Sequence, residues 1–172
     1  MKLSLNHKWT IILGLALLCA LLVPARASAQ QQQDAPVPAF EVKALDGHAV
    51  RSNQLTPAPK WLLIYVEPSC RPCDALLRVF RQEPPRTDLR QKVIVLVGRG
   101  TVADARELAD RFDWIPADSW YSDETGKASE ALHAQGAPIA HGIVLGGIAW
   151  KLGGSLPERQ SLESILLTWI DK

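Results

Sequence analysis

The chain has 172 residues, enough for one domain with a short appended segment. Its hydrophobic content of 47% is ordinary for a globular protein. Three of the 19 Lys and Arg residues lie within residues 1–29, which leaves 16 against 18 Asp and Glu in residues 30–172, a net charge of −2. This balance gives no basic footprint for nucleic acid, so nucleic-acid binding is not expected.

Residues 1–29 have the pattern of a signal peptide. Lys2 and Lys8 form a positive start, an apolar run covers residues 11–23, and the Ala-Ser-Ala sequence at 27–29 supplies the small residues that a signal peptidase reads. Because the run is shorter than the roughly 20 residues of a membrane span, we predict cleavage and export to a bacterial periplasm. An uncleaved inner-membrane anchor is the alternative.

Residues 30–38 are polar and punctuated by prolines, which predicts a disordered linker. A folded domain is expected over residues 39–172. It begins with a short strand at 39–45, which turns at Asp46-Gly47 into residues 49–55.

The following segments alternate between strand and helix. Continuous apolar runs at 61–66 and 93–97 predict strands that are covered on both faces of a sheet. Apolar residues at helical spacing follow the first run at 73–82, and follow the second run behind Thr101, a residue that caps helices well.

The last part of the domain predicts a hairpin and a closing helix. Its elements are a short strand at 120–121, a helix at 129–135 ended by Gly136, strands at 139–145 and 148–152 joined at Gly146-Gly147, and an amphipathic helix from Pro157 with Leu162, Ile165, Leu166 and Trp169 on one side. Strands and helices alternate in the first part of the domain, and a hairpin follows in the last part. This order predicts an α/β fold with a mixed central sheet flanked by helices.

The sequence Cys70-Arg71-Pro72-Cys73 starts just after a predicted buried strand and runs into the first turn of a helix. A helix N-terminus presents unpaired N–H groups and a partial positive charge, which both stabilise a thiolate. We therefore expect Cys70 to be the nucleophile, with Arg71 adding a positive charge beside it. Pro72 lies where a missing N–H costs nothing, and Cys73 is placed to resolve a mixed disulfide.

Other uses of the two cysteines fit the sequence less well. A disulfide across so short a loop constrains the unfolded chain very little, so a structural bond is inefficient. A zinc site lacks further ligands, since His48, His133 and His141 are scattered singly. A copper site formed by Cys70, Cys73 and His141 is kept as an alternative, because thiolates and imidazole suit copper.

From about residue 39 to its end the chain resembles the thioredoxin-like superfamily, in particular the exported TlpA- and ResA-like thiol-disulfide oxidoreductases of the cytochrome c maturation type. The resemblance is carried by the strand, Cys-x-x-Cys motif and helix, by Gly136-Ala137-Pro138 before the strand at 139–145, and by the N-terminal hairpin. The Pro-Ser pair before Cys70 is also similar to thioredoxin-like proteins of methylamine utilisation.

The resemblance implies a thioredoxin-like fold with an N-terminal hairpin extension. Pro138 would be the cis-proline of the family, and the backbone of Ala137 would pair with an extended substrate beside Arg71 and Pro72.

The sequence departs from the family just before the motif. Ser69 stands where the family has tryptophan, and Ile64 stands where thioredoxins bury an acid. Glu67 is then the nearest candidate in the sequence for proton transfer to or from Cys73.

These observations predict an exported protein disulfide oxidoreductase, with the reductase direction favoured because the proline before Cys73 resembles reducing members. No bound cofactor is expected, since the electrons move as cysteine thiols. The expected partners are protein thiols and disulfides, together with a membrane electron donor if the protein is a reductase, and we expect a monomer. The alternatives are the copper chaperone and a non-catalytic thioredoxin-like scaffold.

Overall fold

The computed structural model describes residues 35–81, 87–153 and 159–171. The predicted signal peptide and the predicted start of the last helix at Pro157 lie outside these residues. Within them, none of the helices has the length and apolar character needed to cross a membrane.

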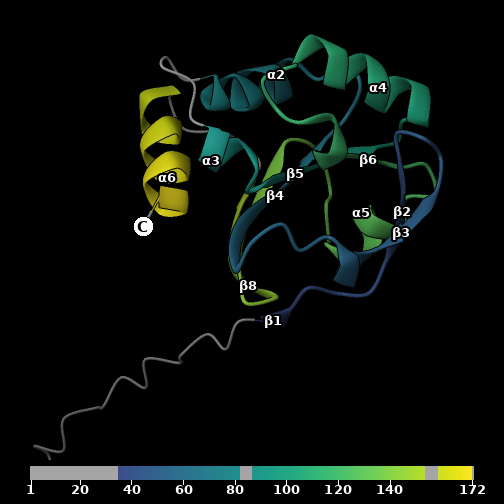
Figure 1. The fold of residues 1–172 in the computed structure, drawn as a ribbon, viewed down its shortest axis with the longest axis horizontal. Coiled ribbons are helices and arrows are strands. Elements are labelled where there is room, and N and C mark those ends of the chain that lie inside the picture. The colour runs from purple at the N-terminus through teal and green to yellow at the C-terminus, as the bar shows by residue number, and fades with distance from the viewer. Residues whose placement is uncertain (1–34, 82–86, 154–158, 172) are drawn as a thin grey trace, which may run out of the picture. The chain divides into compact units, whose positions relative to one another are not determined.

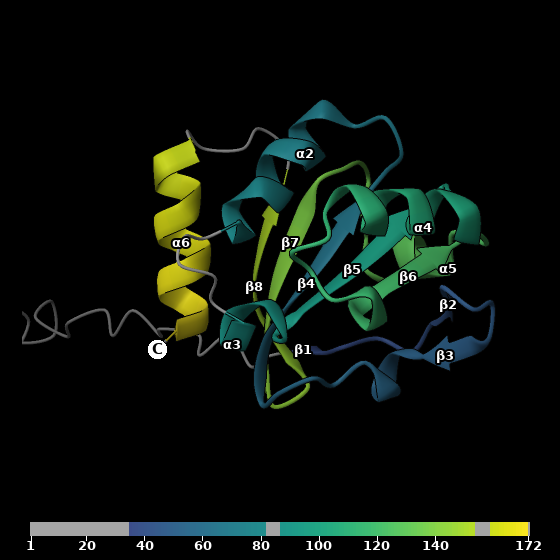
Figure 2. The same ribbon diagram turned by 45° about the horizontal axis from the view of Figure 1, so that its top comes forward.

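In the described part of the chain, eight strands form one mixed sheet (Figures 1 and 2). The strands are β1 (Ala35–Pro36), β2 (Glu41–Ala44), β3 (Ala49–Arg51), β4 (Lys60–Val66), β5 (Val93–Gly98), β6 (Trp120–Asp123), β7 (Ile139–Val144) and β8 (Gly147–Gly153). Their order across the sheet is β1-β8-β7-β4-β5-β6-β2-β3. β4, β5 and β6 run parallel, and the other neighbours are antiparallel, so the predicted mixed α/β sheet is confirmed.

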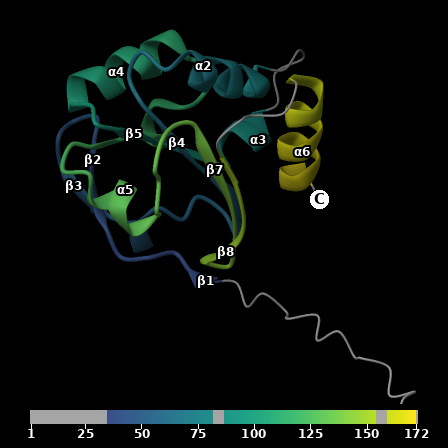
Figure 3. The same cartoon turned by 180° about the vertical axis from the view of Figure 1, so that it is seen from behind.

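Helices cover both faces of this sheet, which explains why β4 and β5 are apolar without interruption. The α2 face, which includes Leu62 and Ile64, packs against α2 (Arg71–Leu77), α4 (Val102–Arg111) and α6 (Arg159–Asp171). The α5 face, which includes Leu63 and Tyr65, packs against α5 (Lys127–Ala131) and the β2–β3 hairpin. Figures 1 and 3 show α5 on the opposite side of the sheet from α2 and α4.

The helices differ from the prediction mainly at their ends. The helix predicted at 73–82 begins at Arg71 and tightens into the 3-10 turn η3 (Arg78–Phe80), while α3 (Thr87–Arg90) was not predicted. The helix predicted at 129–135 is the shorter α5. In α6, Ile165 is 42% exposed rather than packed, and Ile170 is buried in its place. The remaining 3-10 turns are η2 (Ser52–Gln54) and η4 (Ala117–Ser119).

Two predictions about the chain's strands need correction. The predicted linker at 30–38 is already structured at β1, because Ala35 and Pro36 pair with β8 and the N–H of Val37 donates to the carbonyl of Gly146. The turn between β7 and β8 consists of Leu145 and Gly146, both with positive φ, so Gly147 belongs to the strand.

Candidate active site

Three loops meet at the edge of the sheet where the parallel strands β4 and β5 end. Residues 67–70 follow β4, residues 99–101 follow β5, and residues 132–138 lead into β7. Because Tyr65 pairs with Ile139 in the antiparallel β4–β7 register, Pro138 lies beside the end of β4, where the loop to Cys70 begins. The Ala137–Pro138 peptide bond is cis.

Cys70 and Cys73 form a disulfide at the start of α2, with their Cα atoms 5.2 Å apart. Cys70 is the N-cap of α2, and its sulfur accepts the backbone N–H of Cys73 at 3.2 Å. Cys73 is only 2% exposed and belongs to the core of the α2 face, whereas Cys70 is half-buried. The geometry therefore leaves Cys70 partly accessible and shields Cys73.

The other predicted contact residues surround this disulfide. Arg71 and Pro72 are exposed in the first turn of α2. Ala137 is half-buried and packs against the same core cluster as Cys73. The structure thus brings the motif and the residue before the cis-proline to one end of one core.

Strained backbone collects in the same three loops. Ser69, Arg99 and His133 have φ values of 60°, 54° and 50°, in the left-handed region that side chains disfavour. One of them stands in each loop, and the remaining non-glycine residue of this kind among the described ones is Leu145 in the β7–β8 turn. Strain of this kind gathers at functional sites, which agrees with the position of the disulfide.

Glu67 has a partner that the sequence analysis missed. Its carboxylate Oε1 lies 3.6 Å from Nε of Arg99, with the side chains 25% and 70% exposed respectively. Their loops are packed tightly, because a Cβ atom on Gly100 would lie only 2.9 Å from Cγ of Pro68. Arg99 follows a buried strand that is parallel to the strand before Glu67. The carboxyl ends of such strands meet at one edge of a sheet, so the strand pattern could have placed Arg99 near Glu67.

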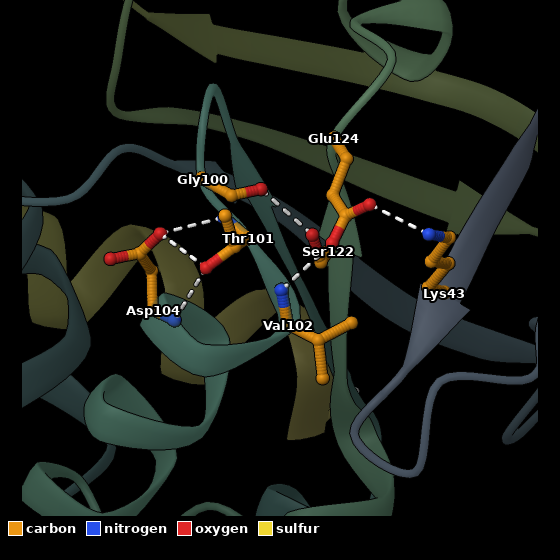
Figure 4. A network of polar contacts seen from close by, with 7 residues as sticks. All are labelled: Lys43, Gly100, Thr101, Val102, Asp104, Ser122 and Glu124. Atoms are coloured by element: carbon orange, nitrogen blue, oxygen red, sulfur yellow. Dashed lines mark hydrogen bonds and ion pairs between the residues drawn. The ribbon is translucent and has the colours of Figure 1, made fainter.

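A polar network holds the 99–101 loop in place (Figure 4). The hydroxyl of Ser122 donates to the carbonyl of Gly100 at 2.8 Å. Glu124 accepts the N–H of Val102 at 3.1 Å and the ammonium of Lys43 at 2.7 Å. The bond from Lys43 and then the N–H of Val102 hold the pKa of Glu124 below its usual value.

The predicted cap of α4 forms the other half of this network. Thr101 and Asp104 make a capping box, in which the N–H of Thr101 donates to Asp104 at 2.6 Å and the N–H of Asp104 donates to the Thr101 hydroxyl at 3.2 Å. The N–H and the hydroxyl of Thr101 lower the pKa of Asp104. Arg99 and Gly100 are therefore carried on a loop fixed at its far end.

His141 lies on the α5 face, away from the cysteines. It pairs with Leu63 of β4 and Lys151 of β8, and it is 1% exposed, with no hydrogen-bond partner for Nδ1 in the described structure. Burial, and then the charge of Lys151, lowers the pKa of His141 to about 4.

This position separates the three ligands of the copper alternative. Directly opposite residues of neighbouring strands share a face, so His141 lies with Leu63 while Cys73 packs on the other face. Among the described residues no three His, Cys, Asp or Glu side chains gather as a metal site. The set of Cys70, Cys73 and His141 that the copper alternative requires is therefore not assembled as a single site among the described residues.

No family model matches the chain, and no curated protein matches it in sequence. Solved structures do match it in fold. An uncharacterized thioredoxin-like protein of Porphyromonas gingivalis has a TM-score of 0.61 at 17% identity, covering 78% of this chain and 92% of its own. A thiol:disulfide interchange protein of the thioredoxin family from Chlorobium tepidum has a TM-score of 0.54 at 14% identity, covering 80% and 97%.

A secreted disulfide oxidoreductase of Mycobacterium tuberculosis, homologous to DsbE of E. coli, has a TM-score of 0.55 at 14% identity, covering 75% of this chain and 95% of its own. These likenesses show that the chain has a thioredoxin-like fold, as the resemblance implied.

Proposed function

We propose that the protein is an exported thiol-disulfide oxidoreductase that reduces disulfides in other proteins. The observation that carries the proposal is the unequal exposure of the two bonded sulfurs at the N-terminus of α2. A structural disulfide has no need of one accessible sulfur, whereas thiol exchange requires it.

The proposed reaction starts from the reduced protein. The thiolate of Cys70 attacks one sulfur of a substrate disulfide and forms a mixed disulfide, while the other substrate sulfur leaves as a thiolate. Cys73 then loses its proton and attacks Cys70, which closes the Cys70–Cys73 bond and releases the second substrate thiol. Two electrons pass to the substrate, so a membrane donor must reduce the protein again.

The surroundings of the disulfide support the roles of the other residues. The N–H of Cys73, which donates to Cys70 in the oxidised protein, stabilises the Cys70 thiolate in the reduced one. Ala137 is half-buried and packs against the core cluster that contains Cys73, which supports a role for its backbone in pairing with an extended substrate.

Glu67 is the proposed proton acceptor for Cys73. In support, its side chain is 25% exposed in the loop that leads to Cys70, and its carboxylate forms an ion pair with Arg99. Glu67→Gln is expected to slow the closing of the mixed disulfide about a hundredfold. An unchanged rate would leave Glu67 only a structural role, as the partner of Arg99.

Export is supported by residues 1–29, and a secreted neighbour in the structural comparison agrees with it. The neighbours described as DsbE-like or as thiol:disulfide interchange proteins favour the TlpA- and ResA-like branch.

The deciding experiment is the reduction potential of the Cys70–Cys73 pair, read by alkylation and mass after equilibration in glutathione or dithiothreitol buffers. A value near about −270 mV, as in thioredoxin, supports a reductase. A value near about −120 mV means an oxidant that forms disulfides in its partners, and the proposed direction is then wrong. A Cys70→Ser, Cys73→Ser double variant with full function in the cell would point to a non-catalytic scaffold.

A further inference from the structure

The exposed side of α2 carries a shallow pocket of about 290 Å³ that begins one residue after Cys70. Its lining consists of Arg71, Asp74, Ala75 and Arg78. These residues recur at helical spacings of three and four, so they share one face of the helix.

Positive charge is in excess around this pocket. The carboxylate of Asp74 is paired with Nη2 of Arg111 at 3.2 Å. Arg71 and Arg78 are exposed and form no ion pair with any residue that the structure describes. Two guanidinium groups that have no ion pair with a described residue therefore flank the pocket, on a chain whose residues 30–172 have a net charge of −2.

Building on the proposed function, we infer that this α2 pocket binds carboxylate side chains of the partner protein, so that the preferred substrates carry Asp or Glu beside the target disulfide. Guanidinium groups bind carboxylates through paired hydrogen bonds, and the small side chain of Ala75 leaves room between the two arginines. The pocket selects the substrate, and the exchange chemistry stays at the disulfide.

The distance between the two arginines predicts the spacing of the acidic residues in the substrate. Arg71 and Arg78 are seven residues apart, which is about 10 Å along a helix. An extended peptide rises about 3.3 Å per residue, so two acidic residues about three positions apart span both arginines.

The test compares matched peptides that contain the same internal disulfide and differ only in two flanking residues, Glu in one and Gln in the other. The reduced full-length protein is mixed with each peptide, quenched with acid and alkylated, and the second-order rate constants give a Glu-to-Gln ratio. Wild-type protein is expected to give a ratio of roughly five to ten at low salt, falling toward one at about 0.5 M salt.

Arg71→Gln with Arg78→Gln should bring the ratio to about one. Arg51→Gln with Lys127→Gln removes the same two charges from exposed positions outside the pocket, in β3 and at the start of α5. This variant should leave the ratio unchanged, which makes it the matched control. A wild-type ratio of one, or a ratio that the Arg71→Gln, Arg78→Gln variant keeps, overturns the inference while the proposed function stands. Failure to reduce either peptide counts against the proposed function itself.

An anionic membrane is the competing occupant of the same charges. If the Arg71→Gln, Arg78→Gln variant lost binding to phosphatidylglycerol vesicles while the peptide ratio of the wild-type protein stayed at one, the α2 pocket would be a membrane contact and the inference would be wrong.

Discussion

Cys70 and His141 lie on opposite faces of the same sheet, and their surroundings differ in accessibility and in hydrogen bonding. On the α2 face Cys70 is half-buried, its sulfur accepts a backbone N–H, and it lies next to loops with a strained backbone. On the α5 face the imidazole of His141 and the hydroxyl of Tyr65 are enclosed, without a hydrogen-bond partner at His141 Nδ1 or at the Tyr65 oxygen among the described residues.

The comparison shows that the most deeply buried titratable groups are not the groups beside the disulfide. Burial raises the pKa of Tyr65 and lowers the pKa of His141, so both side chains stay neutral near neutral pH. A buried titratable group with a shifted pKa is often a sign of an active site, but here the shifted groups are on the face without the disulfide. In this fold the disulfide is distinguished by the accessibility of Cys70 and by its place at a helix N-terminus, and not by a shifted pKa beside it.

The largest effects are expected from the cysteines. Cys70→Ser removes the accessible nucleophile and should reduce disulfide exchange by at least about a thousandfold. Cys73→Ser should still allow the first attack and so accumulate a mixed disulfide with substrate, detectable as a mass adduct. Equal adduct formation by the two variants would contradict the assignment of attacking and resolving roles.

A packing change on the α5 face should have the next largest effect. A Cβ atom at Gly98 would lie 1.6 Å from the Tyr65 oxygen, in a strand whose residues are all buried. Gly98→Ala is therefore expected to lower the free energy of unfolding by about 3 kcal/mol, measured by urea denaturation.

Tyr65→Leu in the same chain removes the clashing ring atoms and supplies the control. The double variant should lose less free energy of unfolding than the sum of the two single losses, by about 1–2 kcal/mol. Additive losses would show that Tyr65 and Gly98 do not meet as the structure has them.

The features that the sequence predicted well are those set by local chemistry. The apolar runs gave β4 and β5, Thr101 gave the start of α4, and the Cys-x-x-Cys motif was placed at a helix N-terminus. Each depends on a periodicity or a cap that is readable within about ten residues.

The features that the sequence missed depend on distant partners. β1 is two residues long and is defined by its pairing with β8, so it has no hydrophobic periodicity from which it could be predicted. The Glu67–Arg99 pair joins two loops more than thirty positions apart. The separation of His141 from the cysteines follows from the register of β7 against β4, which a single strand does not reveal.

His141 makes the α5 face sensitive to acid. Its folded pKa of about 4 lies below the ordinary 6.5, so the unfolded chain takes up a proton first as the pH falls, and stability present above about pH 6.5 is lost toward pH 4. The contribution of this residue at about pH 5 is a loss of roughly 2 kcal/mol relative to neutral pH. His141→Leu should remove that part of the pH dependence of unfolding.

The control for His141 is His133→Asn, which removes an exposed imidazole and keeps a residue that accepts the left-handed backbone there. This variant should retain the acid sensitivity of the wild-type protein. If His141→Leu and wild type lose stability in parallel between about pH 7 and pH 5, the imidazole is not the group that titrates.

The smallest effect is expected on the α2 face, at the ion pair between Asp74 and Arg111. Their side chains are 28% and 46% exposed, and such a pair contributes at most about 1 kcal/mol. Asp74→Asn should therefore change the midpoint of urea unfolding very little. Among the described residues that line the α2 pocket, Asp74 supplies the one carboxylate, so its removal should raise the preference for the Glu peptide about twofold. A loss of several kcal/mol would mean that this face depends on Asp74 for packing, and an unchanged preference would mean that its charge does not reach the substrate.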